Sequence, residues 1–166
     1  ISSGDNKITT TSTSLSNLVA RDLITITGTT NNNSTFTVKS VASDGLSIIV
    51  EETVTAESSD GSTDTVLTYS GFVTDKVRGD GFYSQPDGVH TVAYQVNATC
   101  TGAIKMQGSL ATTPTEDDFF DISGTTFTTD QSTLISSNNF TGNFVWVRAK
   151  CTSNTAGAVS SILFNN

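Results

Sequence analysis

His90, the only histidine of the chain, is the residue best suited by type to acid–base chemistry. A histidine next to Ser and Asp can activate a hydroxyl nucleophile, and Ser84 and Asp87 precede His90 closely. This combination is expected by chance in a serine-rich chain, and a turn-forming Pro86-Asp87-Gly88 stretch comes just before His90. We therefore interpret His90 as a turn residue that hydrogen-bonds locally, and the sequence indicates no catalytic residue.

An acidic segment, Glu116-Asp117-Asp118 followed by Asp121, offers the carboxylate oxygens that calcium prefers. It lacks the Asp-x-Asp-x-Asp-Gly spacing of a standard calcium loop. We expect a solvated loop in which Asp117 or Asp118 caps a turn. The sequence thus predicts no metal ligand and no residue that binds a cofactor.

The tripeptide Arg78-Gly79-Asp80 matches a short integrin-adhesion motif. Such a tripeptide recurs often by chance, and Gly79 and Gly81 indicate a flexible loop instead.

Cys100 and Cys151 are the only cysteines, too few for a disulfide framework. Each ends a predicted strand on its inward face, so a bond between neighbouring or facing strands is geometrically possible. Two buried free thiols are the alternative if the protein assembles in a reducing cytoplasm.

Three aromatic residues, Tyr94, Phe144 and Trp146, are candidates for a platform on which a sugar ring stacks. Because all three lie inside predicted strands, we favour core packing for them.

The elements that position these residues are predicted to be β-strands. The chain combines 35% hydrophobic with only 14% charged residues and is rich in Thr, Ser, Gly and Asn, which is typical of short strands joined by polar turns. The formal net charge of −8, without any Lys/Arg cluster, argues against nucleic acid as a partner. No apolar run is long enough to cross a bilayer, so we expect no membrane association. The sequence starts at Ile1 rather than Met, so it begins either after processing or inside a longer polypeptide.

The first part of the chain is predicted to form a small barrel-like unit. Its expected interior residues are Leu23, Ile26, Phe36, Val38, Leu46 and Ile48. Five strands are expected, at residues 7–11, 23–27, 35–41, 46–50 and 64–69.

The second part is predicted to form an antiparallel β-sandwich of the jelly-roll or immunoglobulin-like kind, with the boundary between residues 1–69 and 70–166. Alternation places Val92, Tyr94, Val96, Ala98 and Cys100 on one face of the first strand, and Ile104, Met106 and Leu110 on the inward face of the next. Residues 158–164 close the sheet, and Phe119, Phe120 and Ile122 are expected to plug one end.

The segment Phe140–Cys151 is predicted to be one central strand, covered on both faces. Period two directs Val145, Val147, Ala149 and Cys151 to one side, and Phe144, Trp146, Arg148 and Lys150 to the other. The two charged residues are expected to mark the place where the strand emerges into solvent.

Two groups of motifs resemble β-modules of virion structural proteins from tailed phages. In the first part these are the Ile-Thr-Ile-Thr-Gly, Phe-Thr-Val-Lys-Ser-Val and Leu-Ser-Ile-Ile-Val segments. In the second part the segments at 81–83, 87–92, 106–118 and 140–149 look like a β-sandwich module, particularly of phages that infect marine cyanobacteria. The resemblance implies a decoration, neck, tail or fibre protein located in the virion, and it carries over no catalytic residue.

These observations lead to two hypotheses. The first is a non-enzymatic virion protein that binds other virion proteins and forms a symmetric homo-oligomer, with a trimer favoured. The alternative is a carbohydrate-binding or adhesion module for a host-surface glycan, which would use an exposed aromatic residue such as Tyr83 or Trp146.

Overall fold

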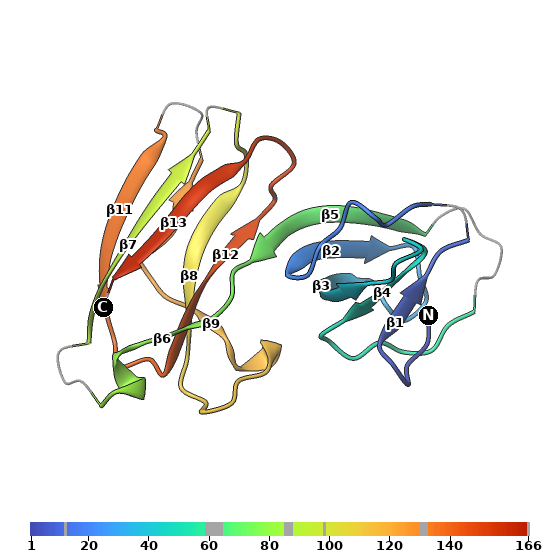
Figure 1. Ribbon diagram of the computed structural model, residues 1–166, viewed down its shortest axis with the longest axis horizontal. Helices are drawn as coiled ribbons and strands as arrows, with labels where there is room; N and C mark the ends of the chain where they lie inside the picture. Colours follow the sequence, from blue (N-terminus) through green and yellow to red (C-terminus); the bar gives the residue numbers. More distant parts are fainter. Residues whose placement is uncertain (12, 59–64, 85–87, 98, 130–132, 166) are drawn as a thin grey trace. The chain divides into compact units, whose positions relative to one another are not determined.

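The computed structural model describes residues 1–11, 13–58, 65–84, 88–97, 99–129 and 133–165. It is all-β, as the composition predicts, and its strands pair antiparallel. The chain divides into two compact units, Ile1–Phe72 and Val73–Asn166 (Figure 1). The predicted boundary between residues 69 and 70 falls inside the strand β5 (Val66–Val73). The observed division lies between Phe72 and Val73, at the end of this strand.

Unit 1 contains one sheet with the strand order β1-β4-β3-β2-β5. Its other strands are β1 (Lys7–Thr9), β2 (Asp22–Thr27), β3 (Ser34–Val41) and β4 (Ser47–Val50). All five strands were predicted, and β2 and β3 form the predicted hairpin. Irregular register in the pairings of β2 with β5 and of β3 with β4 bends the sheet. Among the described residues it remains open, because β1 and β5 end the order within this unit without pairing with each other.

The core of unit 1 follows the predicted alternation at most positions. Of the predicted interior residues, Leu23, Ile26, Phe36, Val38 and Ile48 are buried. Ile24, which was not among them, is buried as well. The prediction for Leu46 is wrong, since this side chain is 39% exposed. Leu46 lies in the turn before β4, where its backbone N–H binds the Asp44 carboxylate at 2.9 Å, so strand alternation does not apply to it.

Unit 2 is a sandwich of two antiparallel sheets (Figure 1). One sheet has the order β12-β8-β10, with β6 on β12 and β9 on β8, and the other has the order β11-β7-β13. The strands are β6 (Val77–Arg78), β7 (Val89–Val96), β8 (Ala103–Ser109), β9 (Phe120–Asp121), β10 (Phe127–Thr128), β11 (Ile135–Thr141), β12 (Trp146–Thr152) and β13 (Val159–Asn165). Two 3-10 turns, η1 (Asp80–Phe82) and η2 (Glu116–Asp118), complete the unit.

The interior of unit 2 lies between these sheets. The Tyr94 ring of β7 stacks on Phe127 of β10 at 5.9 Å between centroids, and its hydroxyl donates to Thr125 O at 2.8 Å. The predicted inward residues Val92, Tyr94, Val96, Ile104, Met106, Val147, Ala149 and Cys151 are buried. Leu110, which follows the end of β8, is 64% exposed, so its predicted burial is wrong. Ala98 and the Pro86-Asp87 part of the predicted turn lie outside the described residues.

The prediction of a single strand over Phe140–Cys151 is also wrong. Phe140 lies near the end of β11, and Trp146 is the first residue of β12. These two strands belong to different sheets. Gly142 separates them with φ +154°, and a Cβ there would lie 2.4 Å from the Phe144 ring, so only glycine fits. The chain therefore crosses from one layer to the other here, and Phe144 fills the crossing.

Candidate functional site

His90 is a core residue of β7 and not the turn residue that the sequence predicted. Its side chain is fully buried, stacked on Phe164 at 5.5 Å and tilted against Phe140 at 5.0 Å between ring centroids. Nε2 lies 3.0 Å from Gly142 O, so the hydrogen bond joins positions far apart in sequence. Ser84 is exposed, and Asp87 lies outside the described residues. The described contacts of His90 are therefore those of a residue that packs in the core.

Arg148 is buried as well, contrary to the expectation that it marks an emerging strand end. Its Nε donates to Gln107 Oε1 at 3.0 Å and its guanidinium pairs with Glu116 Oε2 at 2.7 Å. The Phe119 ring lies 3.8 Å from Cζ. The guanidinium therefore has an acceptor at Nε, a carboxylate at Nη1 and an aromatic ring near Cζ, and Glu116 serves to neutralise a buried charge.

The remaining carboxylates of the acidic segment have structural partners. Asp118 closes a capping box with Thr115, and the backbone and side-chain hydrogen bonds from Thr115 lower its pKa, which confirms the predicted turn cap. Burial alone would raise the pKa of Asp121, but hydrogen bonds from Lys105 and Gln107 and the positive charges of Lys105 and Lys150 lower it. In the described part of the chain, no three His, Cys, Asp or Glu side chains are arranged to hold a metal ion.

The Arg78-Gly79-Asp80 tripeptide is ordered, not a flexible loop. Arg78 belongs to β6, Gly79 precedes η1, and the Asp80 side chain is buried with 4% exposure. A Cβ at Gly79 would lie 2.5 Å from Phe144 O, because the backbones approach closely here. An adhesion receptor that must reach the aspartate carboxylate is therefore excluded by burial.

The end plug predicted for Phe119, Phe120 and Ile122 forms only in part, since Ile122 is buried and Phe120 is 45% exposed.

Cys100 and Cys151 are buried free thiols. Burial, together with the proximity of Cys100, raises the pKa of Cys151 to about 12, and burial also raises the pKa of Cys100. Both groups are therefore protonated and shielded near neutral pH.

We expect iodoacetamide to leave the folded protein unmodified at pH 8, because neither thiol is exposed as a thiolate. Addition of denaturant, without reductant, should allow both cysteines to react. Intact-mass spectrometry measures the two states. A denatured protein that gains label only after reduction would show a disulfide, and labelling of the folded protein at the denatured rate would show that the thiols are accessible.

Of the three proposed platform residues, Tyr94 and Phe144 are buried and only Trp146 reaches the surface. Burial raises the pKa of Tyr94, consistent with a core position. Trp146 is half-buried, and its indole N–H donates to Thr112 O at 3.1 Å. Of the three residues, only Trp146, the first residue of β12, therefore remains a candidate for stacking against a sugar.

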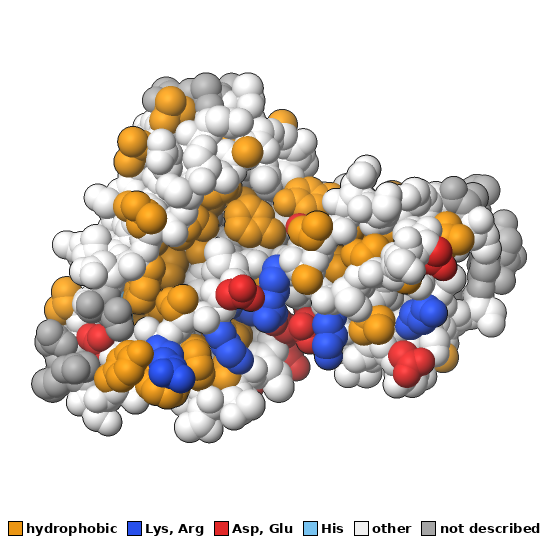
Figure 2. All heavy atoms as spheres, viewed as in Figure 1, with side chains coloured by type: hydrophobic (Ala, Val, Ile, Leu, Met, Phe, Trp, Pro, Cys, Tyr) orange, Lys and Arg blue, Asp and Glu red, His pale blue; other side chains and the backbone are white. Residues whose placement is uncertain are grey.

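An aromatic groove lies at this end of β12. Its walls are Lys76, Val77, Arg78, Tyr83, Trp146 and Phe164, around a volume of about 570 Å³. Phe82 buttresses it, with its ring 5.2 Å from Tyr83 and 5.4 Å from Trp146 between centroids. Lys76 Nζ lies 5.2 Å from the Trp146 ring, and Arg78 Cζ lies 4.2 Å from the Phe82 ring. Figure 2 shows basic side chains lying against hydrophobic ones over β6 and η1.

Local structure explains how the groove forms. β6 pairs with the start of β12, with Arg78 opposite Trp146 and Val77 opposite Val147. The chain then turns through η1, whose Gly81 N–H donates to Phe144 O at 2.9 Å. This close backbone contact places Phe82 and Tyr83 next to Trp146. Tyr83 and Trp146 were predictable candidates from residue type, but Lys76 and Phe82 were not, because their proximity to Trp146 depends on a pairing between distant segments.

A second surface feature is the outer face of the three-stranded sheet, the side of β11, β7 and β13 turned away from the core. None of the residues of these strands is Asp, Glu, Lys or Arg. Figure 2 shows the surface over them as uncharged side chains with scattered hydrophobic ones. The register places these residues on the outer face: Val89, Thr91, Ala93 and Gln95 of β7, Ile135, Ser137, Asn139 and Thr141 of β11, and Ser161, Leu163 and Asn165 of β13.

No family model, curated protein or solved structure matches this chain. Across the residues that the structure describes, no helix is sufficiently long and apolar to pass through a membrane. The two surfaces are thus weighed on their own chemistry, one as a ligand groove and the other as a contact face.

Proposed function

We propose that this chain is a non-enzymatic structural protein that assembles with further copies of itself through the outer face of the three-stranded sheet. In line with the resemblance of its motifs to tailed-phage modules, we place it in the virion, as a decoration, neck, tail or fibre component bound to other virion proteins. We expect a symmetric oligomer, with a trimer favoured, in which two different parts of this surface meet between neighbouring copies and the ring closes.

The observation that carries this proposal is the absence of charge on the outer face, in a chain of net charge −8. Copies with the same strong net charge repel each other, so contact costs least where no charge must be brought together or desolvated. Ile135 and Leu163 are each 65% exposed on this face, and Val89 is 50% exposed. Covering these three side chains would contribute the apolar burial that an interface core needs.

The polar side chains of the outer face support the same function. Thr91 Oγ1 donates to Asn139 Oδ1 at 3.0 Å, and Ser161 Oγ donates to Gln95 Oε1 at 3.3 Å. These bonds join neighbouring strands within the face, so the groups keep partners when water leaves. The desolvation cost of polar groups on assembly is lowered accordingly.

The edges of this sheet also favour contact between copies. Within the described residues, β11 and β13 each pair on one side only, with β7. Neither contains the lysine, other charge or proline with which edge strands usually resist pairing. A strand of another copy could therefore pair with either β11 or β13 and extend the sheet.

A Leu163→Glu variant is expected to convert the oligomer into a smaller species or a monomer, because it replaces an exposed apolar side chain of the contact face with a charge. Size-exclusion chromatography with light scattering measures the mass over a dilution series. Leu110→Glu is the matched control: Leu110 is 64% exposed but lies outside this sheet, so its variant should keep the wild-type mass. A wild-type protein that is monomeric at every concentration would contradict self-assembly.

The virion location is tested separately, by immunogold labelling of purified phage particles with antibodies to this chain. Gold on a defined part of the particle would support the proposal, and its position would identify the component. Intact particles without gold, with label confined to unassembled protein, would contradict it.

A further inference from the structure

We propose that the aromatic groove binds an acidic saccharide, meaning a sugar whose ring bears a carboxylate or sulfate group. This site lies outside the outer face of the three-stranded sheet and does not depend on assembly. It would add recognition of a surface glycan to a structural role.

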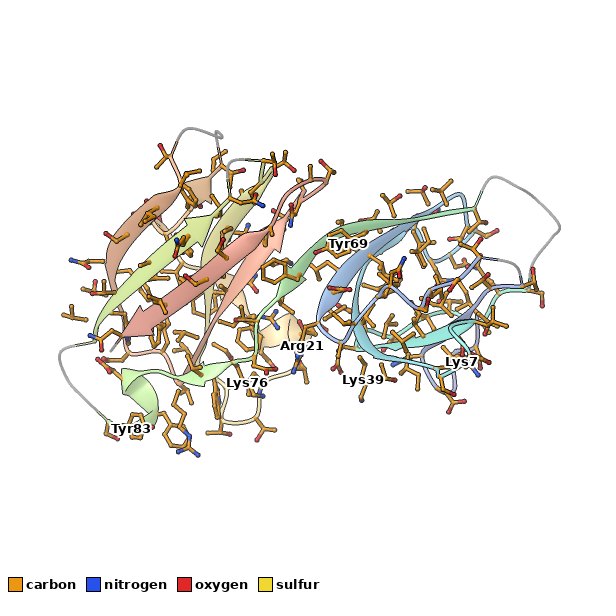
Figure 3. All side chains as sticks on the ribbon, turned by 45° about the horizontal axis from the view of Figure 1, so that its top comes forward. Lys7, Arg21, Lys39, Tyr69, Lys76 and Tyr83 are labelled. Carbon is orange, nitrogen blue, oxygen red and sulfur yellow. The ribbon has the colours of Figure 1, made fainter. Side chains whose placement is uncertain are left out.

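The shape of the groove suits a small part of a glycan chain. Its volume of about 570 Å³ is comparable with that of small-molecule sites, but the groove is shallow and open to solvent, as suits a sugar ring that binds on a surface. Most of its walls come from the short segment that contains β6 and η1, together with Trp146 at the start of β12. Figure 3 shows Lys76 just before β6 and Tyr83 just beyond η1, at the two ends of this segment.

The aromatic side chains provide a stacking surface. Tyr83 is 53% exposed and Phe82 39% exposed, so both rings are open to a ligand. The C–H faces of a sugar ring are apolar, and they pack against such rings while the hydroxyl groups point into water. The hydrogen bond from Trp146 to Thr112 and the edge contacts of Phe82 fix the rings beforehand, which reduces the entropy lost on binding.

The basic side chains specify an anionic sugar. Lys76 and Arg78 are two positions apart in an extended segment, so they project to the same side of it. Both cations line the groove, in a chain whose net charge is −8, so the groove is a local positive site on an acidic protein. The Lys76 ammonium attracts a carboxylate or sulfate as a point charge, and the Arg78 guanidinium, which already has an interaction within the chain, adds to the positive potential.

Other classes of ligand fit the groove less well. An acidic peptide binds by adding a strand to a sheet edge or to a cluster of Arg side chains, but β6 is only two residues long and the groove has one arginine. Nucleic acid requires many phosphate contacts for appreciable affinity, and the groove offers two cations. A sugar needs neither a sheet edge nor a long basic track.

The test is a glycan array on which each acidic saccharide, bearing a uronic acid, sialic acid or sulfate, is printed beside its neutral counterpart. The full chain is applied, and the strongest acidic hit is then titrated calorimetrically. Lys76→Gln and Tyr83→Ala are each expected to weaken this binding by about tenfold or more, as for residues at the centre of a binding site. Matched controls come from unit 1: Lys7→Gln and Tyr69→Ala, which should bind like wild type (Figure 3).

Thermal melting of every variant establishes that it is folded, and both altered groove residues are surface-accessible, so folding should persist. Acidic hits that the groove variants weaken and the unit 1 variants do not would support the site. The proposal is overturned if no acidic saccharide binds better than its neutral counterpart, or if Lys76→Gln and Tyr83→Ala bind like wild type. Preference for acidic peptides or single-stranded nucleic acid over every saccharide would also overturn it.

Discussion

A Glu116→Ala variant is expected to lose about 3–5 kcal/mol of unfolding free energy, the usual cost of leaving a buried charge without its partner. Arg148 is only 4% exposed, and Glu116 supplies the carboxylate that neutralises it at 2.7 Å. After the substitution, the guanidinium keeps the Gln107 hydrogen bond and the Phe119 ring but has no negative charge beside it in the β8–β12 layer. Urea denaturation followed by tryptophan fluorescence measures the change, since Trp146 lies in the same strand as Arg148.

Asp117→Ala is the matched control for this loss. Asp117 lies in the same η2 turn and is exposed, so removing its charge should change stability by no more than about 0.5 kcal/mol. Adding Arg148→Met to Glu116→Ala should recover part of the loss, because the uncompensated charge is then gone. If Glu116→Ala were as stable as Asp117→Ala, the ion pair would not be what allows Arg148 to be buried.

Strand positions were predictable wherever one face of a strand is buried. In β2 and β3, alternation of apolar residues with Thr predicted that Ile26, Phe36 and Val38 face inward, and all three are buried. Ile24 is buried in the same cluster but was not among the predicted interior residues. The same reasoning succeeded for Val147, Ala149 and Cys151 of β12. It failed at Leu46 and Leu110, each immediately outside a strand, because alternation carries no signal for where a strand begins or ends.

The buried polar residues could not be predicted, because their partners are distant in sequence. Arg148 bonds to Gln107, 41 positions away, and His90 to Gly142, 52 positions away. A sequence pattern treats Arg and His as solvent-facing until such partners are known. The crossing at Gly142 was missed for a related reason, since a run of β-formers on both sides hides the one glycine that separates two layers.

The aromatic groove was predictable only in part. Tyr83 and Trp146 were singled out by their residue type, but Trp146 lies 63 positions after Tyr83 (146 − 83). Only the pairing of β6 with β12 brings them together and adds Lys76 and Arg78. The uncharged outer face, in contrast, is visible in sequence as three strands without Asp, Glu, Lys or Arg, once the strands are known to form one sheet.

A His90→Ala variant is expected to lose about 3 kcal/mol of unfolding free energy, at the lower end of the range for removing a large buried ring. The imidazole is fully buried among Phe140, Phe144 and Phe164, with centroid distances of 5.0, 6.0 and 5.5 Å. Truncation would empty this space and remove the imidazole hydrogen bond to Gly142 O, which would keep only the Phe144 N–H at 3.0 Å, at the point where the chain crosses between sheets. Urea denaturation measures the loss, and Ser84→Ala, at an exposed position, should be neutral.

A His90→Phe variant separates the packing contribution of the ring from that of its hydrogen bond. Phenylalanine keeps a ring among the three aromatic neighbours but cannot donate to Gly142 O, so we expect a loss of about 1–2 kcal/mol, smaller than for His90→Ala. This order follows if His90 serves the core, because most of its contribution then comes from the buried ring. Functional residues are commonly kept at some cost to stability, so a His90→Ala protein as stable as wild type, or more stable, would contradict the structural role and revive the acid–base interpretation.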